Sequence, residues 1–338
     1  GDRSAARLLS ALLSAYAAPG SAQGTREAGD RLAETWPTTP NSSRLAFFRA
    51  LAGSAPANLE LPTDRPRPGA QTFKTDRLAR SLDAELSGEL RALSDRLGIE
   101  LPVLLQAVLC AVLHRHTGQA TLLAPAFLPD GPASPSLGLA CERGGPLLLR
   151  SHLPDDLSFR GLLERARAVV QEARTHAPLS YAELVKGSKE SYDLSRAPFL
   201  QVMFRFRSSR GNSALLGRLR ITPADFAPGY SIHELDFCAS YKNEHLRLQV
   251  DYNRHLFSRE TIDRMLGHYQ CLLRAAVRDP EQQVWTAPLL PEAERQRILA
   301  TWNDTAVAIP EDRCVHHLFA QQVERTPSAV ALRFESEA

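Results

Sequence analysis

The sequence has few sulfur-containing residues and no cysteine pattern that indicates a bridge or a metal site. Two of its 338 residues are Met and five are Cys. The cysteines are odd in number and far apart, and no two form a Cys-x-x-Cys pair: Cys110, Cys141, Cys238, Cys271 and Cys314. Neither a disulfide framework nor a zinc site is therefore indicated. Reduced thiols in a cytoplasmic protein are expected instead.

Long apolar runs, a secretory leader and a charge imbalance are also missing. No stretch approaches the roughly 18 apolar residues of a membrane helix, and no signal-peptide pattern is present. The net charge is +2, with acidic and basic residues interspersed. Neither nucleic acid nor membrane is expected as a partner. The chain starts at Gly1 rather than Met and stops just after an apolar run, so we expect it to be part of a longer polypeptide.

What is present is an ordinary globular composition with clear periodicities. The sequence is 43% hydrophobic and 23% charged, which allows a sizeable core. Apolar spacing predicts helices over 4–17, 43–52, 83–97, 101–116, 157–176, 258–277, 292–302 and 314–323. It predicts strands over 120–127, 147–152, 200–207, 219–222, 232–240, 246–252 and 329–334. This order predicts an α/β fold with a mixed β-sheet and flanking helices.

Local signals mark several of the predicted element ends. Ser81 or Asp83 is expected to cap the helix that ends before Gly98, and Ser258 to cap a later one. Gly98 and Gly118 are expected at helix C-termini. The proline-rich residues 61–68 exclude regular structure.

Several stretches resemble the C-terminal lobe of nonribosomal peptide synthetase condensation domains. The most specific is Asp193-Leu-Ser-Arg-Ala-Pro-Phe-Leu-Gln-Val-Met-Phe204, which is similar to the family pattern Asp-x-Ser-Arg-x-Pro-x-x-Gln-Val-x-Phe. Residues 59–68 resemble the segment that crosses between the two lobes, and Leu113-His-Arg-His-Thr-Gly-Gln119 resembles the end of a buried helix and its turn. The fold that this implies is a chloramphenicol-acetyltransferase-like lobe.

The end of the chain resembles the entry to an adenylation domain. The resemblance rests on Trp302-Asn-Asp-Thr-Ala306, Val315-His-His-Leu-Phe319 and Arg325-Thr-Pro-Ser-Ala-Val-Ala331. It implies four parts: the end of the condensation N-terminal lobe with a crossover linker (1–58), the C-terminal lobe (59–287), an interdomain linker (288–313) and the start of an adenylation domain (314–338).

By this resemblance, the parent protein forms an amide between two carrier-bound aminoacyl or peptidyl thioesters. The phosphopantetheine arms of the carriers are substrates, and no cofactor is bound directly. The expected partners are peptidyl carrier protein domains, the adjacent adenylation domain and the condensation N-terminal lobe. A face that normally meets that lobe is expected to expose an apolar patch of several hundred Å².

The family's proton-handling histidine is expected to lie outside this sequence. It is the second His of a His-His-x-x-x-Asp-Gly motif, and Gly1-Asp2-Arg3-Ser4 stands where the tail of that motif is expected, with its first two residues reversed. Gly145-Pro146 also stands where the family commonly has Asn-Thr. No catalytic residue is therefore assigned here. These departures leave open a non-catalytic platform that docks carrier or adenylation domains, while the adenylation-like tail disfavours a free-standing acyltransferase that uses coenzyme A.

The resemblance offers four candidates for the wall of a substrate tunnel. Asp193 and Arg196 are expected to form an ion pair that either fixes a loop or lets Arg196 shape the tunnel. Gln201 is expected to be a hydrogen-bonding group near the acceptor channel. His176 is similar in place to a family histidine, and its alternative is a structural role at a helix end.

Histidines near one another elsewhere do not indicate a metal site. His114 and His116 flank Arg115 at a helix end, where cations offset the helix dipole, and no third ligand accompanies them. His316-His317 is the one adjacent His pair in the sequence, and a structural or surface role is expected for it. No metal is expected.

Overall fold

The computed structural model describes residues 42–53, 56, 58–129, 146–176, 193–207, 214–216, 219–221, 227, 229–242, 245–306 and 314–333. They belong to two units, Gly1–Pro291 and Glu292–Ala338, each of which is described by itself. The helix predicted over residues 4–17 lies outside the described residues, as does Gly145.

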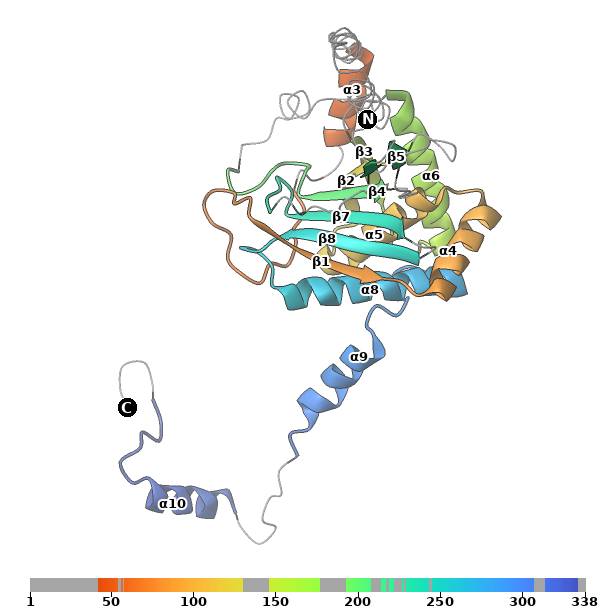
Figure 1. The fold of residues 1–338 in the computed structure, drawn as a ribbon. Coiled ribbons are helices and arrows are strands. Elements are labelled where there is room, and N and C mark those ends of the chain that lie inside the picture. The colour runs from red at the N-terminus through yellow and green to blue at the C-terminus, as the bar shows by residue number, and fades with distance from the viewer. Residues whose placement is uncertain are drawn as a thin grey trace. The chain divides into compact units, whose positions relative to one another are not determined.

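A six-stranded mixed sheet forms the centre of the first unit (Figure 1). The strand order is β1 (Thr75–Ser81), β8 (His245–Asn253), β7 (Leu235–Lys242), β4 (Val202–Arg207), β2 (Thr121–Phe127), β3 (Leu147–His152). Strand β4 runs parallel to β2 and β7, and the other pairs are antiparallel. A separate hairpin pairs β5 (Ala214–Leu216) with β6 (Leu219–Ile221). The predicted mixed sheet is confirmed.

Strand β1 was not predicted, and its position explains why. It lies at an edge of the sheet and pairs with β8 alone, from Thr75 opposite Asn253 to Ser81 opposite Arg247. Only Leu78 of its seven residues is buried. An edge strand that carries charged side chains lacks the apolar alternation by which strands are recognised.

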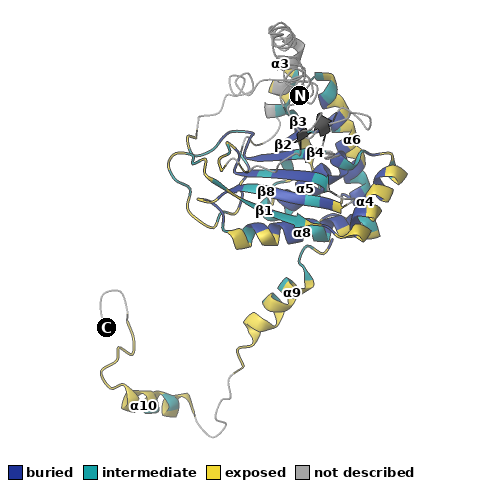
Figure 2. Ribbon diagram, viewed as in Figure 1, coloured by how far each residue is buried: buried dark blue, intermediate teal, exposed yellow. Residues whose placement is uncertain are grey.

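Helices pack on the sheet face that carries the apolar side chains. They are α4 (Ala84–Leu97), α5 (Leu101–Thr117), α6 (Phe159–His176) and α8 (Arg259–Arg278). Helix α5 is buried from Pro102 to His114, and the Tyr269 hydroxyl of α8 donates to the Leu105 carbonyl at 2.7 Å. Figure 2 shows that burial follows the sheet and the helix sides that face it. The core therefore lies between this sheet face and the helices.

The expected helix ends are confirmed in atomic detail. Asp83, not Ser81, caps α4, and its side chain accepts from the Leu86 amide. Gly98 and Gly118 end α4 and α5 in the left-handed conformation. Within the described ranges no individual helix is long and apolar enough to cross a membrane, and α4 and α5, bent by 106°, pass that test only as a pair.

The segment after α8 is tied back onto α5 by Arg115. Its Nη1 donates to the carbonyls of Val284 at 3.1 Å, Trp285 at 2.6 Å and Ala287 at 3.1 Å. The guanidinium also lies 5.2 Å from the centre of the Trp285 ring. Beside it, His116 Nε2 lies 3.0 Å from His268 Nδ1. The last turn of α5 thus holds residues 284–287, which follow α8, against the rest of the first unit.

The second unit holds α9 (Glu292–Leu299), a 3₁₀ turn η1 (Thr301–Asn303) and α10 (Val315–Arg325). The helix predicted over 292–302 is therefore interrupted. The strand predicted over 329–334 is wrong for residues 329–333, which are irregular. No strand in the described part of this unit can pair with them, and an unpaired strand leaves its backbone groups unsatisfied by protein.

Substitution of Gly88 and of Gly98 by Ala is predicted to change the stability of the protein in opposite directions. Gly98 has φ +61°, where Ala is strained, whereas Gly88 is an exposed residue within α4 with open space around its Cα. We expect Gly98→Ala to lower the free energy of unfolding by about 1 kcal/mol. We expect Gly88→Ala to raise it by roughly 0.5–1 kcal/mol. Denaturant unfolding of both variants checks this, and a change of equal sign would contradict the assigned helix end.

Candidate functional site

The motif residues 193–201 form a tight turn directly before β4. Asp193 Oδ1 accepts from the Ser195 amide at 2.8 Å, and its hydrogen bonds to Ser195 lower the pKa of the Asp193 carboxyl. Phe199 is buried and has φ 64°, the one positive value for a non-glycine among the described residues. An aromatic residue in this region is strained. The contacts around the turn must therefore hold it in place.

Gln201 joins this turn to residues 59–73, which contain the predicted crossover stretch 59–68 and which we call the crossover segment. Its buried side chain accepts from the Leu59 amide at 2.7 Å and donates to the Leu59 carbonyl at 3.0 Å. The same Nε2 donates to Glu234 Oε1 at 3.0 Å. Both amide hydrogens are therefore used within the fold, and a hydrogen bond from this nitrogen to a substrate requires one of them to break.

Glu234 connects the same residues to Arg67 through two parallel hydrogen bonds. The Nη1–Oε1 distance is 2.7 Å and the Nη2–Oε2 distance is 2.8 Å. The side chains are 15% exposed for Arg67 and 1% exposed for Glu234. Paired bonds of this kind are the strongest form of ion pairing between Arg and a carboxylate. We call Arg67, Glu234, Gln201 and the Leu59 backbone the crossover clamp.

Arg196 makes a second connection between the turn and the crossover segment. Its Nη1 lies 2.7 Å from Glu60 Oε1, and its Nε lies 3.4 Å from Asp193 Oδ2. The hydrogen bond to Glu60 raises the pKa of Arg196. The Asp193–Arg196 ion pair expected from the sequence is present, but the shorter contact is to Glu60.

His176 does not join these residues. It is the last residue of α6, and its ring stacks on Phe47 of α3 (Ser42–Gly53) with centroids 4.1 Å apart. Its Nδ1 lies 2.9 Å from the Thr175 hydroxyl and 3.1 Å from the Glu172 carbonyl. Of the four predicted residues, the structure brings Asp193, Arg196 and Gln201 together.

His233 belongs to the site although the sequence did not single it out. It precedes Glu234, and its Nδ1 donates to the Leu200 carbonyl at 2.7 Å. Burial lowers the pKa of His233 to about 4. Arg67 and Glu234 were missed as well, because nothing local in the sequence distinguishes them from surface residues until the fold joins them. The φ of Phe199 also has no sequence signal.

A row of charges crosses the sheet face opposite the core. Since strand residues alternate between faces, Arg205, Asp236, Asp251 and Arg77 lie on the side away from Phe204 and Phe237. Arg205 Nη2 lies 2.8 Å from Asp236 Oδ2, and Arg77 Nε lies 2.6 Å from Asp251 Oδ1. The two Asp residues are opposite each other in register. Burial, with the nearby Asp251 adding to it, raises the pKa of Asp236 to about 6.

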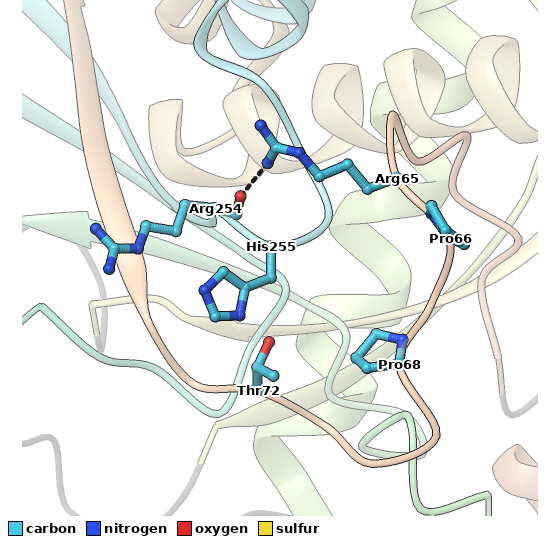
Figure 3. A pocket seen from close by; sticks show the side chains of 6 residues that line it. All are labelled: Arg65, Pro66, Pro68, Thr72, Arg254 and His255. Carbon is cyan, nitrogen blue, oxygen red and sulfur yellow. Dashed lines mark hydrogen bonds between the residues drawn. The ribbon is translucent and has the colours of Figure 1, made fainter.

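An open pocket of about 590 Å³ lies beside the crossover segment (Figure 3). Its lining consists of Arg65, Pro66, Pro68, Thr72, Arg254 and His255. None of the four residues predicted from the sequence lines it.

The crossover clamp and the turn before β4 make contacts that position chain segments. The described residues contain no cluster of three or more His, Cys, Asp or Glu that could hold a metal ion. Burial raises the pKa of the Cys110 thiol to about 11 and also raises that of Cys238. A thiol that stays protonated is a poor nucleophile. The arrangement can fix the relative positions of the crossover segment, the turn at residues 193–201 and residues 233–234.

Comparison with known proteins places this geometry in context. A family model described as Condensation domain matches residues 41–127 and 146–299. A linear gramicidin synthase of Brevibacillus parabrevis is 32% identical over 291 residues, 86% of this chain and 6% of that protein. Chondramide synthase of Chondromyces crocatus is 32% identical over 279 residues, 82% of this chain and 7% of that protein. The chain thus spans a small fraction of these relatives.

Solved structures share the fold. A four-domain nonribosomal peptide synthetase bound to AMP and glycine has a TM-score of 0.65 at 16% identity, covering 78% of this chain and 21% of that one. The X-domain from teicoplanin biosynthesis has a TM-score of 0.64 at 23% identity, covering 79% and 61%. The expected chloramphenicol-acetyltransferase-like α/β lobe is confirmed.

The crossover clamp predicts a large cost for Glu234→Gln. The substitution leaves the Arg67 guanidinium without its counter-charge, so we expect the free energy of unfolding to fall by about 3 kcal/mol. Glu100→Gln is the matched control, because its pair with Arg174 is 25–30% exposed and should cost about 1 kcal/mol or less. The double variant Arg67→Met/Glu234→Gln should cost less than the sum of its single changes. Equal costs for the two Glu→Gln variants would show that the Arg67–Glu234 pair stabilises the fold no more than the partly exposed pair of Glu100 with Arg174.

His233 predicts acid sensitivity in a defined pH window. Its folded-state pKa of about 4 lies below the ordinary 6.5, so between these values the unfolded chain binds a proton that the folded chain excludes. Its contribution to stability is complete above about pH 6.5 and declines as the pH falls toward 4, by up to about 1.4 kcal/mol per pH unit. His233→Asn should flatten this decline in urea unfolding at several pH values, and His245→Asn, at an exposed site, should not. If the pH dependence of stability is the same in His233→Asn as in the unsubstituted protein, the lowered pKa of His233 is not the cause of the decline.

Proposed function

This chain belongs to the condensation domain family, and we propose that it supplies the C-terminal lobe of a condensation domain in a nonribosomal peptide synthetase. The observation that carries the proposal is the family match over residues 41–127 and 146–299. Those residues build the mixed sheet, the crossover segment and the turn before β4. The synthetases to which the chain is similar support the same context.

The proposed reaction forms an amide from two carrier-bound thioesters. The acceptor amine nitrogen bonds to the donor carbonyl carbon, the carbon–sulfur bond breaks, and the donor thiol leaves with the proton that the amine loses. Such a step requires a group that handles the proton and donors for the oxyanion. We assign the proton transfer to a His-His-x-x-x-Asp-Gly motif outside this sequence, because His316-His317 is followed by Gln321-Gln322 where the motif requires Asp-Gly.

Under this proposal the turn before β4 acts through position. Gln201 and Arg196 hold the crossover segment against the sheet, and Asp193 shapes the turn itself. Arg196 is 15% exposed and can still border the tunnel. His176 remains a proposed wall residue at the end of α6. Positional control of this kind matters because small misplacements of reacting groups cost large factors in rate.

The proposed partners are the condensation N-terminal lobe, carrier domains with their phosphopantetheine arms, and an adenylation domain. Exposed large apolar side chains support the first of these. Backbone hydrogen bonds join Gln71 to Leu194 and Ser231 to Phe73, so the segments that carry these side chains are neighbours. The side chains are 47–75% exposed: Phe73, Leu194, Tyr230 and Ile232. We further propose that residues 288–313 are the interdomain linker, that 314–338 begin the adenylation domain, and that the polypeptide is cytoplasmic.

Single-turnover condensation by the parent synthetase tests the proposal. With donor and acceptor carriers loaded, we expect an amide product by mass spectrometry. Replacing the second His of the proposed motif with Ala should lower the rate by about 100-fold or more. His317→Ala, in the tail, is the control and should leave the rate within about twofold.

Three results would contradict the proposal that this chain supplies one lobe while the proton-handling His lies outside it. Amide formation by the 338-residue chain alone would place the proton-handling group inside it. Failure of the parent with competent loaded carriers would instead favour a docking platform. Amide formation from free acyl-coenzyme A in place of the donor carrier would indicate a different acyltransferase.

A further inference from the structure

The start of the crossover segment has the burial pattern of a strand although residues 58–61 belong to no strand of the described sheet. Leu59 and Leu61 are 4% and 6% exposed, whereas the side chain of Glu60 is 64% exposed. This alternation is typical of an extended chain with one buried face. Buried main-chain groups must find hydrogen-bond partners, so groups other than a neighbouring strand supply them here.

Two glutamine side chains supply those partners. Gln201 accepts from the Leu59 amide at 2.7 Å and donates to the Leu59 carbonyl at 3.0 Å. Gln119 accepts from the Glu60 amide at 2.8 Å and donates to the Asn58 carbonyl at 3.1 Å. Each side chain thus makes the two bonds that one residue of an adjacent strand would make. We call Gln119 and Gln201 the glutamine pair.

The two members of the glutamine pair lie on opposite sides of residues 58–60. In an extended chain the amide and carbonyl of one residue point to one side, while the preceding carbonyl and the following amide point to the other. Gln201 binds the first set and Gln119 the second. Gln201 directly precedes β4, and Gln119 lies between α5 and β2. Two elements that are distant in sequence therefore hold this short segment between them.

Gln119 is itself held by the end of α5. Its amide donates to the Thr117 hydroxyl at 3.2 Å, and its carbonyl accepts from His114 Nδ1 at 3.0 Å. His114 is 4% exposed, and Gly118 ends the helix in the left-handed conformation. A residue whose backbone is already fixed loses less entropy when its side chain holds a partner. Gln119 therefore acts from a defined position.

We propose that Gln119 is a positioning residue that acts together with Gln201, because the two side chains fix the point at which the chain enters this lobe from the preceding one. The inference rests on the proposed function, in which residues 1–58 come from the N-terminal lobe and its linker. Neither glutamine contacts a substrate in this role. A shift of the entry point moves the proton-handling histidine relative to groups bound on this lobe, and a displacement of about 1 Å costs a large factor in rate.

Hydrogen exchange of individual amides in the 338-residue chain tests the glutamine pair itself. Gln119→Met nearly keeps the side-chain length and removes both bonds, so the Glu60 amide should exchange at least about tenfold faster and the Leu59 amide should change less. Gln201→Met should produce the reverse order. Gln119→Glu keeps an acceptor for the Glu60 amide but has no hydrogen for the Asn58 carbonyl. Its Glu60 amide should exchange more slowly than that of Gln119→Met.

Single-turnover condensation by the parent synthetase tests the positioning role, with the loaded acceptor carrier supplied as a separate domain. We expect Gln119→Met to lower the rate at saturating carrier at least about tenfold. The carrier concentration that gives half of the maximal rate should stay within about twofold, because Gln119 contacts no substrate. A loss of folded protein does not explain such a result at a temperature well below the melting temperature.

Asp83→Ala is the control for lost stability. It removes the side chain that caps α4 and should lower the melting temperature by a few degrees, as Gln119→Met should. Its rate should stay within about twofold of the unsubstituted parent, because the cap is not in contact with residues 58–60.

A Gln119→Met rate within twofold of the unsubstituted parent would overturn the inference, as would equal losses of rate in Gln119→Met and Asp83→Ala. Unchanged exchange of the Glu60 amide in Gln119→Met would also overturn it. A rate loss that saturating carrier fully restores would place Gln119 at a substrate and contradict the positioning role.

The outcomes separate this inference from the proposed function. Amide formation at the same rate with and without the Gln119 side chain refutes the positioning role and leaves the proposed function in place. If the unsubstituted parent forms no amide from loaded carriers, the proposed function is refuted. The exchange of the Leu59 and Glu60 amides then still decides whether the glutamine pair holds the segment.

Discussion

The ion pair of Arg67 with the buried Glu234 is the contact on which the arrangement of the site depends. It joins residues 167 positions apart, and Gln201 adds a bridge to Leu59 across 142 positions. Removing such charges from water costs several kcal/mol per ion, and their attraction offsets that cost only when the geometry is good and the remaining polar atoms are bonded. Here Oε1 accepts from both Arg67 and Gln201, and Oε2 accepts from Arg67. The pair thus selects one placement of the crossover segment.

That placement explains the unusual backbone next to it. Phe199 adopts a conformation that a free peptide avoids. The residues on both sides of it are held by the Leu200 contact with His233, by the Gln201 contacts and by the Arg196 contact with Glu60. Strain of this kind persists where surrounding contacts determine the backbone, and such places are often functional. The family motif therefore specifies a local geometry rather than a set of reactive groups.

The two faces of the central sheet differ in composition: one is apolar and the other is charged. One face and its helices hold the core, while the other carries the charged row from Arg205 to Arg77. A row of opposite charges bonded in pairs remains compatible with water yet keeps its side chains ordered. Under the function proposed above, this face forms a wall of the substrate tunnel. Residues of the crossover segment line the open pocket.

The sequence by itself determined what depends on neighbouring residues. Asp83, Gly98 and Ser258 mark helix ends through contacts within one turn, and the apolar run of α5 indicates burial without any knowledge of its neighbours. Strand β3 was predicted with its observed bounds, and the motif at 193–204 indicated the family. The tertiary structure decided what depends on distant partners. Edge strand β1 forms because β8 supplies its hydrogen bonds. Residues 329–333 are irregular, and no such partner strand is described for them. Arg67, His233 and Glu234 become a site through contacts across the fold. Hydrogen bonds and ion pairs between distant segments leave no periodic trace in a single sequence, because their energy depends on spatial separation and burial that only folding creates.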